Sequence, residues 1–557
     1  MTIRFAHLAA GLAVMALAAG KVQAQNALPL KFTGKPTVPA ITAADAMTRL
    51  YIFADDSMLG RDAAGPGAVK GTAYIEREVR RMGLVPAGDN GTFFQAIPLY
   101  IRTLDMQSRL VADTDALVAG VDYVPIHPGG SPRPLDGVQV IFAGKTPDAG
   151  AMIPPELAVG KAVAFSGSPT GMARRYPGAV AFILIRPDAT IAQARRFGLQ
   201  PATGMQSEND LVRTPLTLIV PVSKASKLLG VPFENARPGT IGRTLHGDAR
   251  YSVATTSARN VVAILPGSDP KLKNEYVAIG AHSDHIGLRD SGPVNSDSLR
   301  AYNDLAARIY IGRTGEIPGF PGSGLTPAER ARVIVNTDSL RRLRPARLDS
   351  IYNGADDDGS GTVGVLEIAE KFAAAKVKPK RSLLFVWHTG EELGLYGSEY
   401  FTDHPSIPRD SIVAQLNIDM IGRGEASDLP GGGADYLQLL GSRRLSSEFG
   451  NLIEAINDSS TAPFRIDYTF DAAGHPEQYY CRSDHYEYAR YGIPIVFMST
   501  GGHIDYHQLT DEPQFINYTH LAKVANFLAT TAERVANLNH RFVVDGQKPD
   551  PKAECVQ

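Results

Sequence analysis

Residues 276–285 read YVAIGAHSDH, so an apolar run passes directly into the polar residues His282, Ser283, Asp284 and His285. A run of this kind is typical of a strand that is buried on both faces of a sheet. Other largely apolar runs occur in the same half of the chain, at 260–265, 382–387, 412–418 and 493–498. We therefore predict several buried strands there.

Helical segments separate these runs. At 362–375 and 518–536, apolar residues recur at the intervals of an amphipathic helix. Alternation of strands and helices predicts an α/β fold with a doubly wound, mostly parallel sheet from about residue 258 onward. Ligands bind such sheets beyond the carboxyl ends of the strands, so the residues that follow each run are candidates for function.

Composition and charge restrict the class of protein. Of the 557 residues, 44% are hydrophobic and 20% are charged, which is typical of a globular protein. Lys and Arg number 56 against 58 Asp and Glu, for a net charge of -2. Without a basic excess, we expect no nucleic-acid partner.

The segment 1–24 reads as a secretory signal peptide. Arg4 supplies the positive start, 8–19 form an uncharged apolar run, and 22–24 offer small residues before a cleavage site. The apolar run is shorter than the roughly 20 residues that span a bilayer, so we expect no membrane anchor. The predicted location is periplasmic or secreted.

Histidines and carboxylates follow the predicted strands or precede a helix. Alone, most have an ordinary structural explanation, since a lone histidine is commonly part of a core and an acidic turn commonly caps a helix. A carboxylate at the end of an apolar strand is different, because it is costly there unless it is paired. The candidate metal ligands are His282, Asp357, Glu392, Asp419 and His507.

These two histidines and three carboxylates suit divalent ions, and zinc is the first choice. Three carboxylates and one hydroxide balance the charge of two zinc ions. Glu391 precedes Glu392 at the predicted start of a helix, where adjacent side chains point about 100° apart, so Glu391 can face a bound water. We interpret the other histidines, including His285, His388 and His485, as residues that support the site, pack in the core or lie on the surface.

The two cysteines, Cys481 and Cys555, lack the spacing of a structural zinc site. In an oxidising compartment they could form a disulfide, or both could remain free. The sequence leaves both alternatives open.

Taken together, these motifs resemble those of the co-catalytic di-zinc aminopeptidases. Glutamate carboxypeptidases, glutaminyl cyclases and the non-catalytic transferrin receptor share that fold. The resemblance covers about 41–100 and 258–540. Its motifs are GAHSDH (280–285), GADDDGSG (354–361), TGEELGLYGS (389–398), LNIDMIG (416–422) and DYHQLTDEP (505–513).

The resemblance implies a sheet of the zinc-exopeptidase type that holds two zinc ions as cofactors. His282 and Asp419 would hold one zinc ion, and Glu392 and His507 would hold the other. Asp357 would bridge the two ions.

The resemblance also implies roles in catalysis. Glu391 would be the general base, and Asp284 would be a catalytic aspartate behind the metal ligands. Tyr506 would donate a hydrogen bond to the oxyanion, and Arg482 would contact the substrate carbonyl or backbone. An ordinary packed tyrosine or a structural arginine pair explains these last two residues equally well.

The implied function is that of a metallo-aminopeptidase, which releases the N-terminal residue from peptides with a free N-terminus. A hydroxide shared by the two metal ions would be the nucleophile. The alternatives are a carboxypeptidase or dipeptidase of the same fold, which could bind a carboxylate through the arginines at 341–347. A non-catalytic, receptor-like binding protein is the third reading.

The chain divides into parts with different patterns. Residues 288–350 interrupt the last domain as a helical excursion, which we interpret as solvated, with a lid or substrate clamp as the alternative. The predicted parts are a signal peptide (1–24), an N-terminal helical segment that packs on the catalytic domain (25–104), an inserted small α/β domain that resembles protease-associated (PA) domains (105–255), the catalytic domain (256–545) and a tail (546–557).

Overall fold

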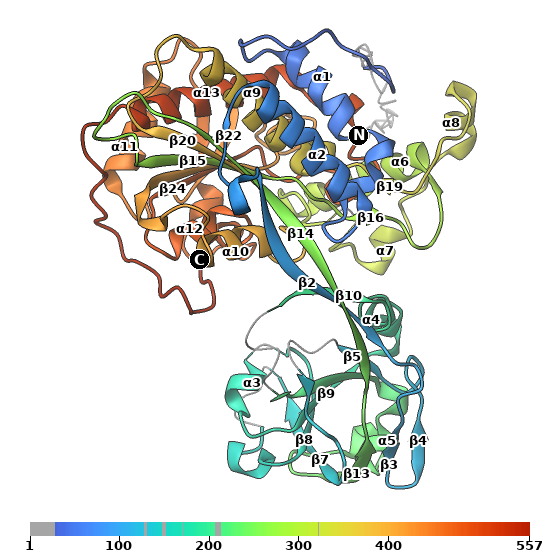
Figure 1. Ribbon diagram of the computed structural model, residues 1–557. Helices are drawn as coiled ribbons and strands as arrows, with labels where there is room; N and C mark the ends of the chain where they lie inside the picture. The colour runs from blue at the N-terminus through green and yellow to red at the C-terminus, as the bar shows by residue number, and fades with distance from the viewer. Residues whose placement is uncertain (1–27, 127–130, 147–151, 170, 207–212, 321) are drawn as a thin grey trace, which may run out of the picture.

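The computed structural model describes residues 28–126, 131–146, 152–169, 171–206, 213–320 and 322–557. The predicted signal peptide at 1–24 lies outside the described residues. Two sheets dominate the described part, one of ten strands and one of eight (Figure 1). No helix of the described residues is both long and apolar enough to cross a membrane.

The larger sheet has the strand order β10-β2-β14-β20-β15-β21-β24-β22-β23, with β1 beside β14. Its central strands β20, β15, β21 and β24 run parallel, as predicted, whereas β14 and β22 pair antiparallel with β20 and β24. The strands are β1 (Val85–Pro86), β2 (Phe94–Leu104), β10 (Ala202–Met205), β14 (Tyr251–Leu265), β15 (Tyr276–His282), β20 (Ser382–His388), β21 (Ile412–Ile418), β22 (Tyr436–Leu440), β23 (Arg465–Asp467) and β24 (Ile495–Ser499).

Helices cover both faces of this sheet. Alternate strand residues point to opposite faces, so that Ala263 belongs to one buried cluster and Val262 to another. The first face is covered by α1 (Ala43–Phe53), α2 (Pro66–Arg81), α9 (Gly361–Ala374), α11 (Ser447–Asp458) and α13 (Tyr518–Ala536). The second is covered by α10 (Tyr396–Asp403) and α12 (His485–Ala489).

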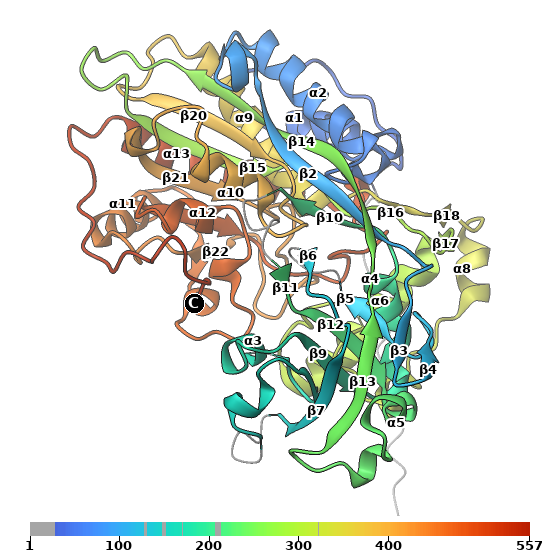
Figure 2. The ribbon, with the colours of Figure 1, turned by 60° about the horizontal axis from the view of Figure 1, so that its bottom comes forward.

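The segment between β2 and β14 forms the inserted domain, which has its own sheet and buried clusters. β2 and β14 pair from Phe94 and Val261 to Leu104 and Tyr251, and they run from the larger sheet into this domain (Figures 1 and 2). Its resemblance to PA domains stays a prediction. Its sheet has the order β4-β3-β13-β7-β8-β9-β12-β5.

The strands of the inserted domain are β3 (Leu110–Ala112), β4 (Asp115–Leu117), β5 (Val124–Ile126), β7 (Val138–Lys145), β8 (Ala162–Ser166), β9 (Ala181–Arg186), β12 (Leu216–Pro221) and β13 (Ile241–Gly247), with β6 (Ser131–Pro132) paired to β11 (Arg213–Thr214). Its helices are α3 (Met172–Arg175), α4 (Ile191–Gly198) and α5 (Ser226–Leu229).

The segment 288–350 contains helices and short strand pairs outside the main sheets. Its helices are α6 (Ser296–Thr314), α7 (Pro327–Arg330) and α8 (Thr337–Leu343). Its short strands form the pairs β16 (Gly287–Leu288) with β19 (Ile351–Tyr352) and β17 (Val294–Asn295) with β18 (Leu348–Asp349).

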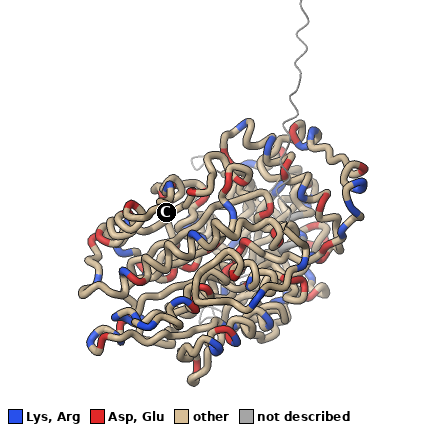
Figure 3. The backbone as a smooth tube through the Cα atoms, turned by 90° about the horizontal axis from the view of Figure 1, so that it is seen from above, with Lys and Arg blue, Asp and Glu red and all other residues tan. Residues whose placement is uncertain are grey.

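The two cysteines are joined. Cys481 and Cys555 form a disulfide, which ties the C-terminal tail to the segment before α12. Along the chain, Lys and Arg are interspersed with Asp and Glu in the view of Figure 3.

Candidate active site

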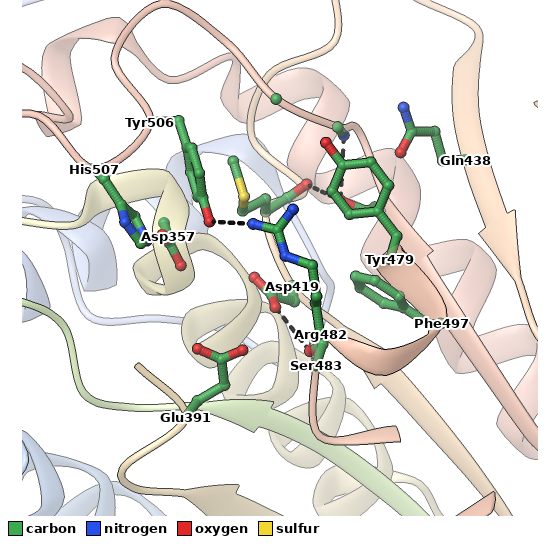
Figure 4. Close-up of a pocket in the computed structure, with 14 residues that line it drawn as sticks. Asp357, Glu391, Asp419, Gln438, Tyr479, Arg482, Ser483, Phe497, Tyr506 and His507 are labelled. Carbon is green, nitrogen blue, oxygen red and sulfur yellow. Dashed lines mark hydrogen bonds and ion pairs between the residues drawn. The ribbon is translucent and has the colours of Figure 1, made fainter. Parts of the chain in front are cut away.

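Four of the five predicted ligands follow neighbouring strands at one edge of the larger sheet, whereas Asp357 lies in the turn before α9. β15 ends at His282, and β21 ends directly before Asp419. β20 ends shortly before Glu391. Because these strands are parallel, their carboxyl ends meet. Figure 4 shows Asp357, Glu391, Asp419 and His507 around one pocket.

The first group of predicted ligands surrounds the ring of His282. Its Nε2 lies 3.1 Å from Oδ1 of Asp357 and 3.6 Å from Oδ1 of Asp419. All three side chains are buried. Ser483 donates a hydrogen bond to the other oxygen of Asp419 at 2.8 Å, which orients that carboxylate.

The second group surrounds Glu392. Nε2 of His507 lies 3.0 Å from Oε2 of Glu392 and 3.0 Å from Oδ2 of Asp357. Nδ1 of His285 lies 2.7 Å from the other oxygen of Glu392. Asp357 therefore presents one oxygen to each group, as a bridging ligand must.

The neighbouring Asp358 also lies beside His282 and Asp419. Its carboxylate, however, accepts hydrogen bonds from backbone N–H groups, at 3.2 Å from His282, 2.8 Å from Gly361 and 3.2 Å from Met420. A carboxylate with these partners is satisfied without a metal ion. Asp358 therefore supports the loops, whereas the two oxygens of Asp357 face the two groups.

The donor atoms of both groups fit metal ions. Buried polar atoms normally have a hydrogen-bond partner, and leaving them without one costs free energy. Here several buried nitrogen and oxygen atoms face each other without forming a hydrogen bond of good geometry, and carboxylate oxygens with imidazole nitrogens are the ligand set that zinc accepts. These atoms are Nε2 of His282, Oδ2 of Asp357, Oδ1 of Asp419 and Oε1 of Glu392.

Glu391 and Glu392 lie in a turn, so the predicted helix start is wrong at this point. Helix α10 begins only at Tyr396. Gly390 and Gly394 have φ values of 90° and 110°, which exclude a helix. The two carboxylates nevertheless diverge as expected, since Glu391 approaches Nε2 of His282 at 3.9 Å and not the second group.

Asp284 connects the first group to Glu391. Its Oδ1 accepts the backbone N–H of Glu391 at 3.3 Å and lies 3.7 Å from Nδ1 of His282. Burial raises the pKa of Glu391 well above its usual value, and the carboxylates of Glu392 and Asp419 raise it further against the opposing effect of His282. A carboxylate with a raised pKa is suited to accept and return a proton.

The pocket beside these groups encloses about 50 Å³, and Arg482 and Tyr506 lie in its wall (Figure 4). Arg482 donates a hydrogen bond to the phenol oxygen of Tyr506 at 3.2 Å. Burial and the charge of Asp357 raise the pKa of Tyr506, so its phenol stays protonated and can donate. Met420, Tyr479 and Phe497 add apolar surface.

The segment 288–350 contacts the loop that carries His507. This contact differs from the prediction that the segment is a solvated excursion. Arg300 lies 3.2 Å from Oδ2 of Asp505, and Arg347 forms two hydrogen bonds of 2.7 Å with Glu512. These ion pairs fasten the segment on both sides of the Tyr506–His507 pair. Helix α8, by contrast, is mostly exposed.

Phe320 of the same segment lies over the two rings of that pair. Its ring centroid is 5.6 Å from that of Tyr506 and 5.7 Å from that of His507. Phe320 is 48% exposed, so the side of its ring that faces away from Tyr506 and His507 is available to a ligand.

The arginines at 341–347 do not line the pocket. Arg341 pairs with Asp338, Arg344 with Asp297 and Arg347 with Glu512. Among the described residues that line the pocket, Arg482 is the cationic one apart from the ring of His507.

His285 is closer to the second ligand group than the sequence suggested. It is buried beside Glu392, with its Nδ1 2.7 Å from Oε1 of that carboxylate. Its position three residues after His282 at a strand end was the available signal. A single histidine-to-carboxylate contact across two loops is not visible in that spacing.

The fold and the two groups of histidines and carboxylates define an α/β protein with donor atoms suited to metal binding beside a small pocket. Residues 328–532 match the model described as Peptidase family M28. This match confirms the resemblance to the di-zinc aminopeptidase family. It includes Asp357, Glu391, Glu392, Asp419 and His507, whereas His282 and Asp284 precede it.

Curated relatives match parts of the chain. Leupeptin-inactivating enzyme 1 of Streptomyces exfoliatus is 32% identical over 159 residues, which are 28% of this chain and 32% of the relative. Leucine aminopeptidase 1 of Ajellomyces capsulatus (strain H88) is 28% identical over 212 residues, 36% of this chain and 51% of the relative. The chain thus spans about half or less of the length of these relatives.

The fold has a counterpart among solved structures. The aminopeptidase from Aneurinibacillus sp. strain AM-1 superposes with a TM-score of 0.51 at 16% sequence identity. The superposition covers 91% of this chain and 97% of that chain. It confirms the α/β fold class.

Proposed function

We propose that this protein is a metallo-aminopeptidase that uses two zinc ions to hydrolyse the first peptide bond of peptides with a free N-terminus. The main support is the position of Asp357, because its two carboxylate oxygens face different ligand groups. The names of the relatives, which include leucine aminopeptidase 1, agree with the proposal.

His282, Asp357 and Asp419 would hold one ion, and Asp357, Glu392 and His507 would hold the other. When bound, the ions supply Lewis acidity that polarises the scissile carbonyl and lowers the pKa of a water molecule.

The side chains around the metal ligands would move the protons. Glu391 would take a proton from the attacking water and deliver it to the departing amine. Asp284 holds Glu391 in place through the backbone N–H of Glu391. Tyr506 would donate a hydrogen bond from its phenol to the carbonyl oxygen as negative charge develops there, and Arg482 orients that phenol.

The charges in the pocket favour an amine over a carboxylate as the recognised end of the peptide. Glu391 and Asp419 line the pocket and can accept hydrogen bonds from an ammonium group. Of the arginines at 341–347, which a carboxypeptidase could use, three pair with carboxylates elsewhere and Arg342 donates a hydrogen bond to Ser339, and none of the four lines the pocket. We therefore propose aminopeptidase activity in preference to carboxypeptidase activity.

A pair of substrates tests the proposal. Purified protein with zinc should hydrolyse leucyl anilide and leave its N-acetylated twin intact. Cleavage of the acetylated compound, or cleavage of neither compound together with cleavage of N-blocked peptides that have a free carboxylate, would contradict aminopeptidase activity.

We further propose that residues 1–24 direct export to the periplasm or the exterior and that the inserted domain belongs to the PA type. The absence of charged residues from the apolar run at 8–19 supports export. The short buried strands of the inserted domain support the PA type.

Phe320→Ala is expected to raise KM about tenfold for substrates with a large apolar residue at the scissile bond, with kcat little changed. Tenfold corresponds to about 1.4 kcal/mol, which is the scale of partly burying an aromatic ring. Kinetics on leucyl and glycyl anilides measure the effect, which should be smaller for glycine. Ile334→Ala is the control, since Ile334 is 77% exposed on the same segment. Equal KM values for Phe320→Ala and the parent protein would contradict the contact.

A further inference from the structure

Residues 59–61 of the N-terminal segment form a left-handed turn that enters between two loops of the site. Leu59, Gly60 and Arg61 have φ values of 54°, 65° and 51°. A Cβ atom on Gly60 would lie 2.2 Å from the carbonyl oxygen of Gly287 and 2.7 Å from that of Tyr352. Only glycine permits this approach, so the turn is built against both loops.

The side chain of Arg61 fills the space between these loops. It is fully buried, and within the described part of the chain its guanidinium donates hydrogen bonds to four backbone carbonyl oxygens. Nε donates to Ser283 at 3.1 Å, and Nη2 donates to Gly354 at 2.8 Å. Nη1 donates to Asn353 at 2.6 Å and to Phe53 at 3.1 Å.

The backbone of Arg61 adds a further contact to the first loop. Its carbonyl oxygen accepts the N–H of His285 at 3.1 Å. Arg61 therefore holds the chain on both sides of Asp284, directly after the metal ligand His282. Its bonds to 353–354 hold the chain directly before the bridging ligand Asp357.

The positive charge of Arg61 has no carboxylate partner among the described residues, since none of their carboxylates forms an ion pair with its guanidinium. Burial lowers the pKa of Arg61 to about 10, so the group stays charged at neutral pH. The carboxylates that act on it electrostatically are Asp511, Asp284, Asp357 and Asp358. A fixed positive charge behind these groups offsets part of their mutual repulsion.

We propose that Arg61 is a positioning residue of the two-metal centre, which ties the loops 283–285 and 353–354 together and so sets the distance between His282 and Asp357. This inference rests on the proposed metal centre. Arg61 lies outside the part of the chain that matches the family model, so the N-terminal segment becomes a component of the site.

The test compares Arg61→Met with Arg49→Met in the full chain. Arg49 is a buried arginine as well, but it pairs with Glu367 and Glu370 at 2.5 Å and with Glu78 at 2.9 Å, and none of these partners belongs to the loops 283–285 and 353–354. Zinc per chain, zinc affinity from competition with a chelator, and the melting temperature of the metal-free protein are measured for each.

Arg61→Met is expected to lower zinc affinity by about ten- to a hundredfold, the scale found for residues that orient metal ligands. Arg49→Met should lower the melting temperature and leave zinc affinity within about twofold, because loss of a buried ion pair away from the site affects the fold alone. Arg61→Lys keeps the positive charge but loses the planar guanidinium with its several donors, so this variant should bind zinc with intermediate affinity. If Arg61→Met does not fold, the zinc affinity of Arg61→Lys is the test.

Unchanged zinc affinity in both Arg61 variants, or an equal loss of affinity in Arg49→Met, would overturn the role of Arg61. A parent protein that binds fewer than two zinc ions would instead overturn the proposed metal centre. The two failures are therefore distinguishable.

Discussion

Replacing Glu391 by glutamine is expected to lower kcat by about a thousandfold while the protein keeps both metal ions. The Glu391 carboxylate lines the pocket at 3.9 Å from Nε2 of His282, and it belongs to neither ligand group. Glutamine has the same shape and still packs in the turn, but its amide cannot accept the proton of the attacking water. The chemical step therefore slows although the site stays assembled.

Steady-state hydrolysis of leucyl anilide gives kcat for this variant, and metal analysis gives zinc per chain. Glu533→Gln is the matched control, since Glu533 is exposed on α13 and does not line the pocket. If Glu391→Gln loses zinc in proportion to activity, Glu391 is a metal ligand and the assignment as general base is wrong.

Asp357→Asn is expected to have the second large effect, with no more than one zinc ion held tightly and kcat lowered on the order of ten-thousandfold. Asparagine offers one carbonyl oxygen and an NH₂ group, which cannot act as the second ligand atom. The substitution also removes a negative charge that helps to balance two divalent ions. The two ligand groups then no longer share a residue.

Asp358→Asn is the matched comparison, because Asp358 is the adjacent buried carboxylate and its oxygens accept backbone N–H groups. We expect this variant to melt at a lower temperature and to retain two zinc ions per chain. Two zinc ions bound with parent affinity by Asp357→Asn would contradict a bridging role for Asp357.

The sheet and its neighbouring helices could be predicted where the local pattern was strong. The predicted strand at 412–418 coincides with β21, and the predicted helix at 518–536 coincides with α13. A strand buried on both faces must be apolar throughout, and a helix on its face must be apolar at helical spacing. Both requirements concern residues that are close together in the chain, so the sequence shows whether they are met.

Other features depended on residues that are distant in the chain. The sequence pattern predicts a helix start at the glutamate pair, but Gly390 and Gly394 adopt left-handed conformations that end regular structure there. The pattern of 288–350 predicts a solvated segment, but its Phe320 lies on Tyr506, which is remote in sequence. The spacing of the two cysteines does not decide their pairing, and the fold brings Cys481 and Cys555 together.

The sequence by itself determined the α/β class and the kinds of ligand that follow the strands, because burial, periodicity and side-chain chemistry act through residues close in the chain. Only the tertiary structure decided that His285 contacts Glu392 and that Arg61 joins the two ligand loops. These contacts depend on directions and distances between separate segments, and packing of the whole chain sets them.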